Sequence, residues 1–383
     1  MFKKKGLALV LAFVLVLGVA LFATGCAPAQ QEPVQQEPAQ QEPVQQEPVQ
    51  QEPAEAPQIG IMLSVGGRGD KSFNDAAIEG LERAKAELGI EYRYEEPADV
   101  AAMEEILRFL AEQEMDLIIS VGFLTADALN VIAQEFPDQK FAIIDSVVDL
   151  PNVSSLVFKE HEGSFLVDAL AALMTETGTV GFVGGMEIPL IQKFHAGFEQ
   201  GVEHINETEG KNVNVVAAYA GTTGEAFRNP VKGKELALAH MDAGADIVYH
   251  ASGGTGLGVF DAAVERDLLA IGVDSNQNWV RPGNIIASML KRVDVAVFNV
   301  VKSVVDDAFV AGANVFGIAE DGVGLTDLNE VTDVERAGVE DDAAKIALIQ
   351  ELKDTIPDEV ISTIDALKQQ IIDGDIVVTD TLQ

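Results

Sequence analysis

The chain has 383 residues, with 62 acidic and 25 basic side chains, and therefore a formal net charge of −37. This charge argues against a nucleic-acid partner, because a protein that binds phosphates needs lysine and arginine to neutralise them. A single cysteine excludes an intramolecular disulfide framework and a cysteine-based zinc site. Hydrophobic residues make up 48% of the chain, too many for a disordered acidic protein.

The first 26 residues have the order of an export signal. Three consecutive lysines from Lys3 precede an apolar run over residues 6–22, and small residues then lead to Cys26. An uncleaved membrane anchor and a buried structural cysteine are the alternatives. The position of Cys26 resembles a bacterial lipobox, in which the cysteine is lipidated and becomes the new N-terminus. We therefore predict a lipoprotein signal peptide over 1–26 and a lipid anchor at Cys26 on the extracytoplasmic face of the cell membrane.

Residues 27–57 contain five copies of Gln-Gln-Glu-Pro at five-residue spacing. Proline at every fifth position prevents helix and sheet, and the segment has no apolar side chain larger than valine. It is predicted to be a disordered tether. Without the three lysines and six glutamates of residues 1–57, the remainder carries −34. Adaptation to a salty habitat and simple solubility of an exported protein both fit this acidity.

From Gln58 onward, short β-branched runs alternate with helical stretches, a pattern typical of parallel sheets covered by helices. The predicted strands are 59–65, 90–94, 116–121, 140–145, 153–158, 179–183, 213–219, 246–250, 268–273 and 285–290. This many strands favours two α/β lobes over one sheet. Residues 58–158 with about 275–312 are assigned to the first lobe, and residues 159–274 with about 313–383 to the second.

In wound α/β folds, ligands bind beyond the carboxyl ends of the strands, so polar and aromatic residues at those ends are candidate ligand contacts. Phe73 stands alone in a polar turn after the first strand and is either a core residue or a stacking platform. Asn74 is either a local cap or a reader of a nucleobase edge, since its amide both donates and accepts. Ser72 and Asp75 have the spacing of a capping box. Phe227 is a second lone aromatic, placed so that a flat ring would fit between it and Phe73.

Further candidates follow later strands. The turn at Gly122-Phe123 is either a plain turn or part of a cleft wall. Asp145 is either a helix cap or a ligand contact, whereas Asp274 is suited to accept from two adjacent hydroxyls, as on a ribose. Lys291 is either surface, a partner of Asp274, or a donor to the ligand. The glycine-rich loop at 252–258 fits neither a dinucleotide fingerprint nor a P-loop, and is read as a tight turn or as backbone N–H groups, at Gly254, for a ligand oxygen.

Residue patterns of catalytic or metal chemistry are missing from the sequence. The five histidines lack metal-ligand spacing, and there is no Gly-x-Ser-x-Gly elbow. No partner acid with a shared proton path can be named for either candidate aspartate. We therefore predict neither an enzyme nor a protein with a metal or cofactor.

The motifs, taken in order, resemble the basic-membrane-protein (Med-like, PnrA-like) family of substrate-binding lipoproteins of ABC importers. The resemblance covers essentially all of residues 58–383. The matching motifs are Asp70–Asp75, Gly122–Leu124, Glu162–Phe165, Gly184-Gly185, Lys232–Glu235, Gly253–Gly256, Ile271–Ser275 and Ser288–Asp294.

The resemblance implies a type I periplasmic-binding architecture with hinge crossovers, and a monomer that captures purine nucleosides (adenosine, guanosine or inosine) for an ABC permease. By resemblance, the base would stack between Phe73 and Phe227, and Asn74 and Asp145 would read its edge. Asp274, Lys291 and the backbone at Gly254 would hold the ribose hydroxyls. Arg228 departs from the asparagine expected after the second phenylalanine. Riboflavin or another small molecule as ligand, or a role as a sensor subunit, is the alternative.

Overall fold

The computed structural model of the chain describes residues 55–380. The predicted signal peptide, the lipidation of Cys26 and nearly all of the predicted tether lie outside the described residues. The described residues belong to one compact unit of the chain. Within the described part, no helix combines the length and the hydropathy needed to cross a membrane.

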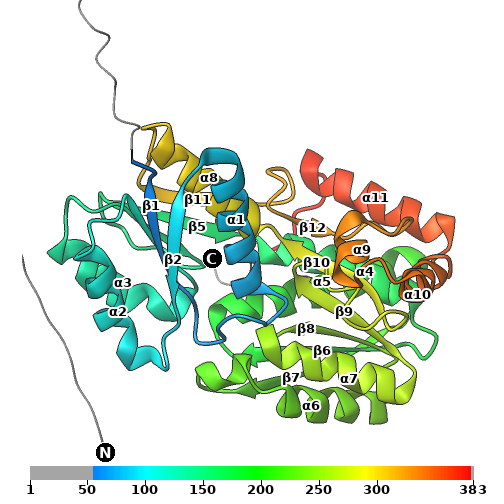
Figure 1. Ribbon diagram of the computed structural model, residues 1–383. Coiled ribbons are helices and arrows are strands. Elements are labelled where there is room, and N and C mark those ends of the chain that lie inside the picture. Colours follow the sequence, from blue (N-terminus) through cyan, green and yellow to red (C-terminus); the bar gives the residue numbers. More distant parts are fainter. Residues whose placement is uncertain (1–54, 381–383) are drawn as a thin grey trace, which may run out of the picture. The chain divides into compact units, whose positions relative to one another are not determined.

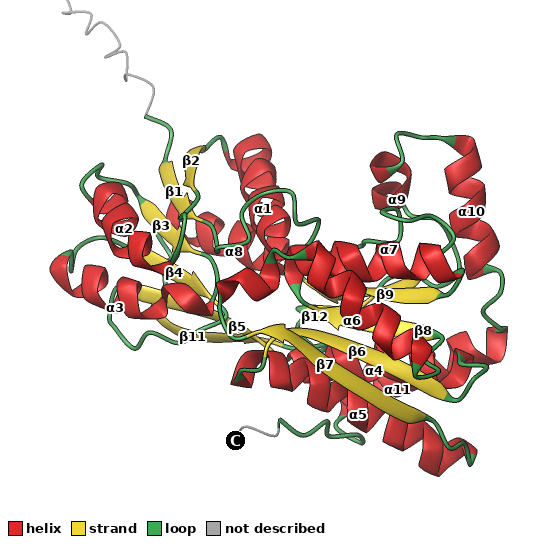
Figure 2. Cartoon of the chain, turned by 90° about the horizontal axis from the view of Figure 1, so that it is seen from below, coloured by secondary structure: helices red, strands yellow, loops and turns green. Residues whose placement is uncertain are grey.

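Two lobes, each built on a six-stranded sheet, make up the described chain (Figures 1 and 2). In spatial order, the first sheet contains β11 (Gly312–Phe316), β5 (Val153–Phe158), β4 (Phe141–Ile144), β3 (Leu117–Ser120), β1 (Gln58–Met62) and β2 (Glu91–Glu95). The second contains β12 (Val323–Leu325), β10 (Ile285–Lys291), β9 (Leu269–Asp274), β8 (Ile247–Ala251), β6 (Thr179–Met186) and β7 (Asn214–Gly221). Neighbouring strands are parallel except β12, which runs antiparallel to β10.

Helices cover both faces of each sheet (Figure 1). Those of the first lobe are α1 (Phe73–Leu88), α2 (Met103–Ala111), α3 (Ala126–Glu135) and α8 (Val293–Val305), with 3-10 turns η1 (Val100–Ala102) and η2 (Phe123–Thr125). Those of the second are α4 (Glu160–Met174), α5 (Pro189–Glu209), α6 (Pro230–Asp242), α7 (Gly256–Arg266), α9 (Asp333–Gly338), α10 (Ala343–Lys353) and α11 (Asp358–Asp373), with η3 (Gly224–Phe227) and η4 (Gly253–Thr255).

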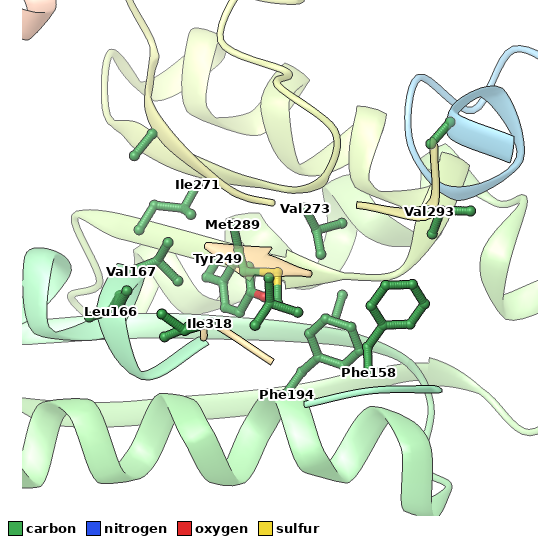
Figure 3. Close-up of a cluster of buried hydrophobic side chains, with 14 of the residues drawn as sticks. Phe158, Leu166, Val167, Phe194, Tyr249, Ile271, Val273, Met289, Val293 and Ile318 are labelled. Carbon is green, nitrogen blue, oxygen red and sulfur yellow. The ribbon is translucent and has the colours of Figure 1, made fainter. Parts of the chain in front are cut away.

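The central strands are apolar throughout because helices bury them from both sides. Every residue of β3 and of β4 is buried, whereas the edge strand β2 is largely exposed. One apolar cluster runs through both lobes, and smaller clusters lie under α2–α3 and under α6–α7. Figure 3 shows the continuous cluster where Phe158, Phe194 and Met289 meet from β5, α5 and β10. The predicted α/β class with two lobes is confirmed.

The chain crosses between the lobes after β5, after β10 and after β11. This differs from the expected return of residues 275–312 to the first lobe. Strand β10 pairs with β9 and so stays in the second sheet, and the return begins only with α8, which packs on α1. Strand β11 then completes the first sheet beside β5. The sequence analysis placed the returning strand too early because it did not recognise β11.

Candidate functional site

A pocket lies between the two lobes, at the carboxyl ends of the central strands. The space between atoms in this pocket, including the open solvent at its mouth, is about 580 Å³. Six of the seven predicted ligand-binding residues line it: Phe73, Asn74, Asp145, Phe227, Asp274 and Lys291. Of the glycine-rich loop, Ser252 and Gly253 line the pocket, and Gly254 does not.

Two phenylalanine side chains reach the pocket from opposite lobes. Phe73 is the first residue of α1, and Phe227 is the last residue of η3. The ring of Phe227 lies directly on the backbone of Gly185, where a Cβ atom would come within 2.2 Å of the ring. On its other side it meets the ring of Phe123 edge-on, at 6.3 Å and 67°. Backbone without a side chain at Gly185 therefore leaves room for the Phe227 ring.

Lys291, the last residue of β10, is the buried cation of the pocket. Its Nζ lies 2.6 Å from Asp145 Oδ1 and 3.1 Å from Glu160 Oε1, and its side chain is 1% exposed. The predicted pairing with Asp274 is replaced by these two closer carboxylates. The rings of Phe158 and Phe194, seen in Figure 3, surround the same ammonium group at 5.1 and 5.5 Å.

A second, partly exposed lysine extends this ion pair to the first crossover between the lobes. Lys193 of α5 donates to Glu160 Oε2 and to the carbonyl oxygen of Phe158, both at 3.0 Å. Phe158 ends β5 and Glu160 begins α4, so the lysine fixes the first crossover between the lobes. Neither Glu160 nor Lys193 is predicted from the sequence: Glu160 lies two residues beyond β5, in the first turn of α4, and Lys193 lies within α5. If Lys291 is taken as buried, its charge requires a carboxylate partner, and this requirement is the signal that could have identified Glu160.

Burial and charge shift the titration of these groups. Burial raises the pKa of Asp145 to about 6 against the opposing effect of Lys291, and raises that of Asp274 to about 6 in the same way. Burial also acts to raise the pKa of Glu160, but Lys291 and Lys193 outweigh it and hold that pKa below its usual value. The same carboxylates outweigh burial at Lys291 and raise its pKa. Lys291 is therefore charged throughout the physiological range.

Asp145 and Asp274 occupy equivalent places in the two lobes. Asp145 directly follows β4 and Asp274 ends β9, and each strand is the third from the corresponding edge of its sheet. Both residues have positive φ, 67° and 65°. Aspartate is one of the few residues other than glycine that tolerate this left-handed backbone conformation. The backbone thus turns a carboxylate towards the pocket from each side, a strained arrangement typical of functional sites.

Asn74 has a structural role as well as a place in the pocket wall. Its Oδ1 accepts from the backbone N–H of Ser64 at 2.8 Å, and its Nδ2 donates to Asp70 at 3.0 Å. An amide nitrogen carries two N–H groups, so one donor is left for a ligand. The two readings of Asn74, local cap and ligand contact, are therefore compatible.

The predicted capping box at Ser72 and Asp75 is wrong. Asp70 takes the cap instead: its carboxylate accepts from the backbone N–H groups of Ser72, Asn74 and Asp75, at 3.0, 2.9 and 3.2 Å. The Asp75 carboxylate turns to the preceding loop and accepts from the N–H of Gly69. A buried carboxylate makes more hydrogen bonds here than a serine hydroxyl would, which explains why the shorter motif does not form.

Within residues 55–380, no group of three or more histidine, cysteine, aspartate or glutamate side chains is arranged to hold a metal ion. His250, below the glycine-rich loop, has a pKa lowered to about 4, mainly by burial. Its Nε2 lies 3.2 Å from Gln277 Oε1. His250 is therefore a neutral, hydrogen-bonded side chain buried beneath the glycine-rich loop.

The comparisons with known sequences agree with this geometry. The family model described as "ABC transporter substrate-binding protein PnrA-like" matches residues 58–381. An uncharacterized lipoprotein of Pyrococcus abyssi is 38% identical over 331 residues, which cover 83% of this chain and 79% of that protein. Basic membrane protein D of Borreliella burgdorferi is 31% identical over 285 residues, covering 72% of this chain and 80% of that protein.

A solved structure gives the same result for the fold. The crystal structure of an ABC transporter solute-binding protein from Aeropyrum pernix K1 matches with a TM-score of 0.77 and 34% identity, covering 84% of this chain and 94% of that one. The predicted family and the predicted type I periplasmic-binding architecture are thus confirmed. The chain belongs to the PnrA-like family of ABC transporter substrate-binding proteins.

Proposed function

We propose that the protein is a lipid-anchored, extracytoplasmic binding protein that captures purine nucleosides between its lobes and delivers them to the permease of an ABC importer. It works as a monomer and without catalysis. The observation that carries the proposal is one pocket in which Phe73 and Phe227 enter from opposite lobes beside the carboxylates of Asp145 and Asp274. Family membership supports the role in import, and the lipoproteins among the relatives support an anchor at Cys26.

The chemistry of the pocket fits the parts of a nucleoside. A flat base offers a face to each phenylalanine ring, and such stacking contributes about 1–3 kcal/mol per base. Asp145 and the remaining N–H of Asn74 suit the donor and acceptor edge of a purine. Asp274 suits two adjacent ribose hydroxyls, and Lys291 and Gly253 line the same pocket.

The charge of the site favours a nucleoside over its phosphorylated form. Asp70, Asp145 and Asp274 line the pocket together with one lysine, Lys291. That lysine is already shared by Asp145 and Glu160, so in the described part of the pocket wall no unpaired cation faces a ligand. A phosphate would therefore be repelled, whereas an uncharged ligand meets no such barrier.

Calorimetric titration tests the proposal on residues 55–383, unfolded and refolded to remove any retained ligand. We expect adenosine, guanosine or inosine to bind and their 5′-monophosphates not to bind. Phe227→Ala should weaken nucleoside binding by about 1–3 kcal/mol through lost stacking. Phe109→Ala, on exposed α2, is the matched control and should leave affinity unchanged. A protein that binds none of the nucleosides, or binds riboflavin instead, contradicts the proposal.

Nucleoside binding is expected to weaken as the pH falls through about 6. The pKa values of Asp145 and Asp274 are both raised to about 6, so below that pH each carboxylate takes up a proton and loses acceptor capacity. Affinity should be constant near neutral pH and then fall by up to about tenfold per pH unit for each carboxylate that binding requires.

Calorimetry with a nucleoside and its 2′-deoxy analogue across this range separates the contribution of Asp274. The deoxy analogue should bind less tightly at neutral pH, by about 1–3 kcal/mol, and with a flatter pH profile. Circular dichroism at each pH controls for unfolding. Equal binding of both ligands at every pH rules out Asp274 as the ribose acceptor.

A further inference from the structure

Ser72 occupies the N-cap position of α1, yet its hydroxyl makes no capping hydrogen bond. An N-cap serine ordinarily accepts with its side chain from the first turn of the helix. Here Asp70 takes that role, and the Ser72 hydroxyl instead donates to Asp274 Oδ2 in the other lobe. The sequence thus uses a second residue for the cap and frees the serine for a contact between the lobes.

Further bonds join the same two segments. Gln277 Nε2 donates to the carbonyl oxygen of Lys71 at 2.8 Å, and the Ser275 hydroxyl donates to the carbonyl oxygen of Ser72 at 3.4 Å. Ser72 and Gln277 are both 0% exposed, so these bonds are shielded from water. Residues 71–72 of the first lobe are therefore clasped by residues 273–277 of the second.

Residues 273–277, the second-lobe side of this contact, are fixed by hydrogen bonds within their own lobe. Gln277 Oε1 accepts from the N–H of Val273 at 2.8 Å, and the N–H of Gln277 donates to Ser288 Oγ on β10 at 3.0 Å. Asn278 accepts from the same serine hydroxyl and donates to Glu335 of α9, at 2.8 Å each. The segment is rigid within its lobe, so closing the lobes requires little reordering of it.

The first-lobe half is equally fixed. Asp75 accepts from the N–H of Lys71 at 3.0 Å, and Asp70 accepts from that of Ser72. Lys71 also has a positive φ of 56°, which a lysine adopts only where its surroundings hold it. Two preformed surfaces that bond only across the interlobe gap stabilise one relative position of the lobes.

We propose that Ser72 and Gln277 form a latch that stabilises the closed arrangement of the lobes and positions Asp274 beside the ligand. The role in ligand affinity rests on the proposed function, whereas the closure itself needs no ligand. Neither latch residue lines the pocket. Replacing Gln277 therefore affects a ligand through the equilibrium between open and closed lobes, whereas replacing Ser72 also removes a hydrogen bond from the Asp274 carboxylate.

The test measures the distance between the lobes in residues 55–383, a segment without cysteine. Fluorophores at Ala86→Cys on α1 and Ala239→Cys on α6, both exposed, report closure in single-molecule energy transfer. Ser72→Ala should lower the ratio of closed to open molecules about tenfold or more, as expected for a hydrogen bond to a buried carboxylate. Gln277→Met, which keeps the length of the side chain but removes both its donor to Lys71 and its acceptor for Val273, should shift the ratio in the same direction.

Ser275→Ala is the matched control, because it removes the long 3.4 Å contact from the same segment; it should change the ratio by less than about twofold. An unchanged ratio in both Ser72→Ala and Gln277→Met overturns the latch. A loss of nucleoside affinity in Gln277→Met without a change in distance also overturns it. If the distances shift as expected but no nucleoside binds the unaltered protein, the latch stands and the proposed function fails.

Discussion

Lys291→Met is expected to lower the free energy of unfolding by about 3–5 kcal/mol, because it leaves two buried carboxylates without their shared cation. The side chains of Asp145 and Glu160 are 5% and 1% exposed, so water does not replace the lost ammonium group. The loss of unfolding free energy caused by Lys291→Met should be smaller at acidic pH, where protonation neutralises Asp145. Urea unfolding monitored by circular dichroism, at neutral and at mildly acidic pH, measures both effects.

Two further variants separate the loss of charge from the loss of a side chain. Lys302→Met removes the partner of Asp306 in an exposed ion pair on α8, and should cost less than about 1 kcal/mol. Adding Asp145→Asn to Lys291→Met removes one uncompensated charge and should recover part of the stability. If Lys291→Met costs no more than Lys302→Met, the ion pair does not have the role assigned to it here.

All ten strands predicted from the sequence exist in the structure, with ends shifted by a few residues. Strands 153–158 and 285–290 show why: each is a short, almost fully buried run with two β-branched residues, a composition that favours a strand. The two strands that sequence analysis missed are β11 and β12. Strand β11 alternates partly buried and exposed residues, and β12 has three residues, so neither forms an apolar run. Their places depend on the crossovers, which no local pattern encodes.

The sequence predicts those residues of the candidate site that directly follow a strand. Phe73, Asp145 and Asp274 follow directly from this rule and line the pocket. Glu160 and Phe194 lie on helices, and they reach Lys291 only because the first crossover brings α4 and α5 against β10. The failed capping box at Ser72 has a similar cause: a tertiary contact with the other lobe outweighs the local preference of a serine.

Asp168 of α4 is a fully buried carboxylic acid with no assigned role in ligand binding. Neither of its carboxylate oxygens has a hydrogen-bond partner among residues 55–380. The backbone of α5 packs directly against it, since a Cβ atom at Gly201 would lie 2.9 Å from Asp168 Cβ. Burial raises the pKa of Asp168 well above its usual 3.8. We therefore expect the folded protein to hold this side chain in its neutral, protonated form.

This proton makes folding less favourable as the pH rises. Above the unfolded-state pKa, the unfolded chain releases the proton and the folded chain keeps it, so stability is lost by about 1.4 kcal/mol per pH unit until the folded-state pKa is reached. Asp168→Asn keeps the shape and removes the titration. The variant should be more stable than the unaltered protein at neutral pH, with the difference shrinking towards acidic pH.

Urea unfolding of residues 55–383 at several pH values measures this difference. The exposed Asp365→Asn on α11 is the matched control, because it makes the same chemical change and alters the net charge equally. It should shift stability by no more than about 0.5 kcal/mol. A constant difference between Asp168→Asn and the unaltered protein at every pH would show that Asp168 is ionised in the folded state. Such a carboxylate would need a hydrogen-bonding partner at the interface of α4 and α5, because an isolated buried charge is too costly to persist there.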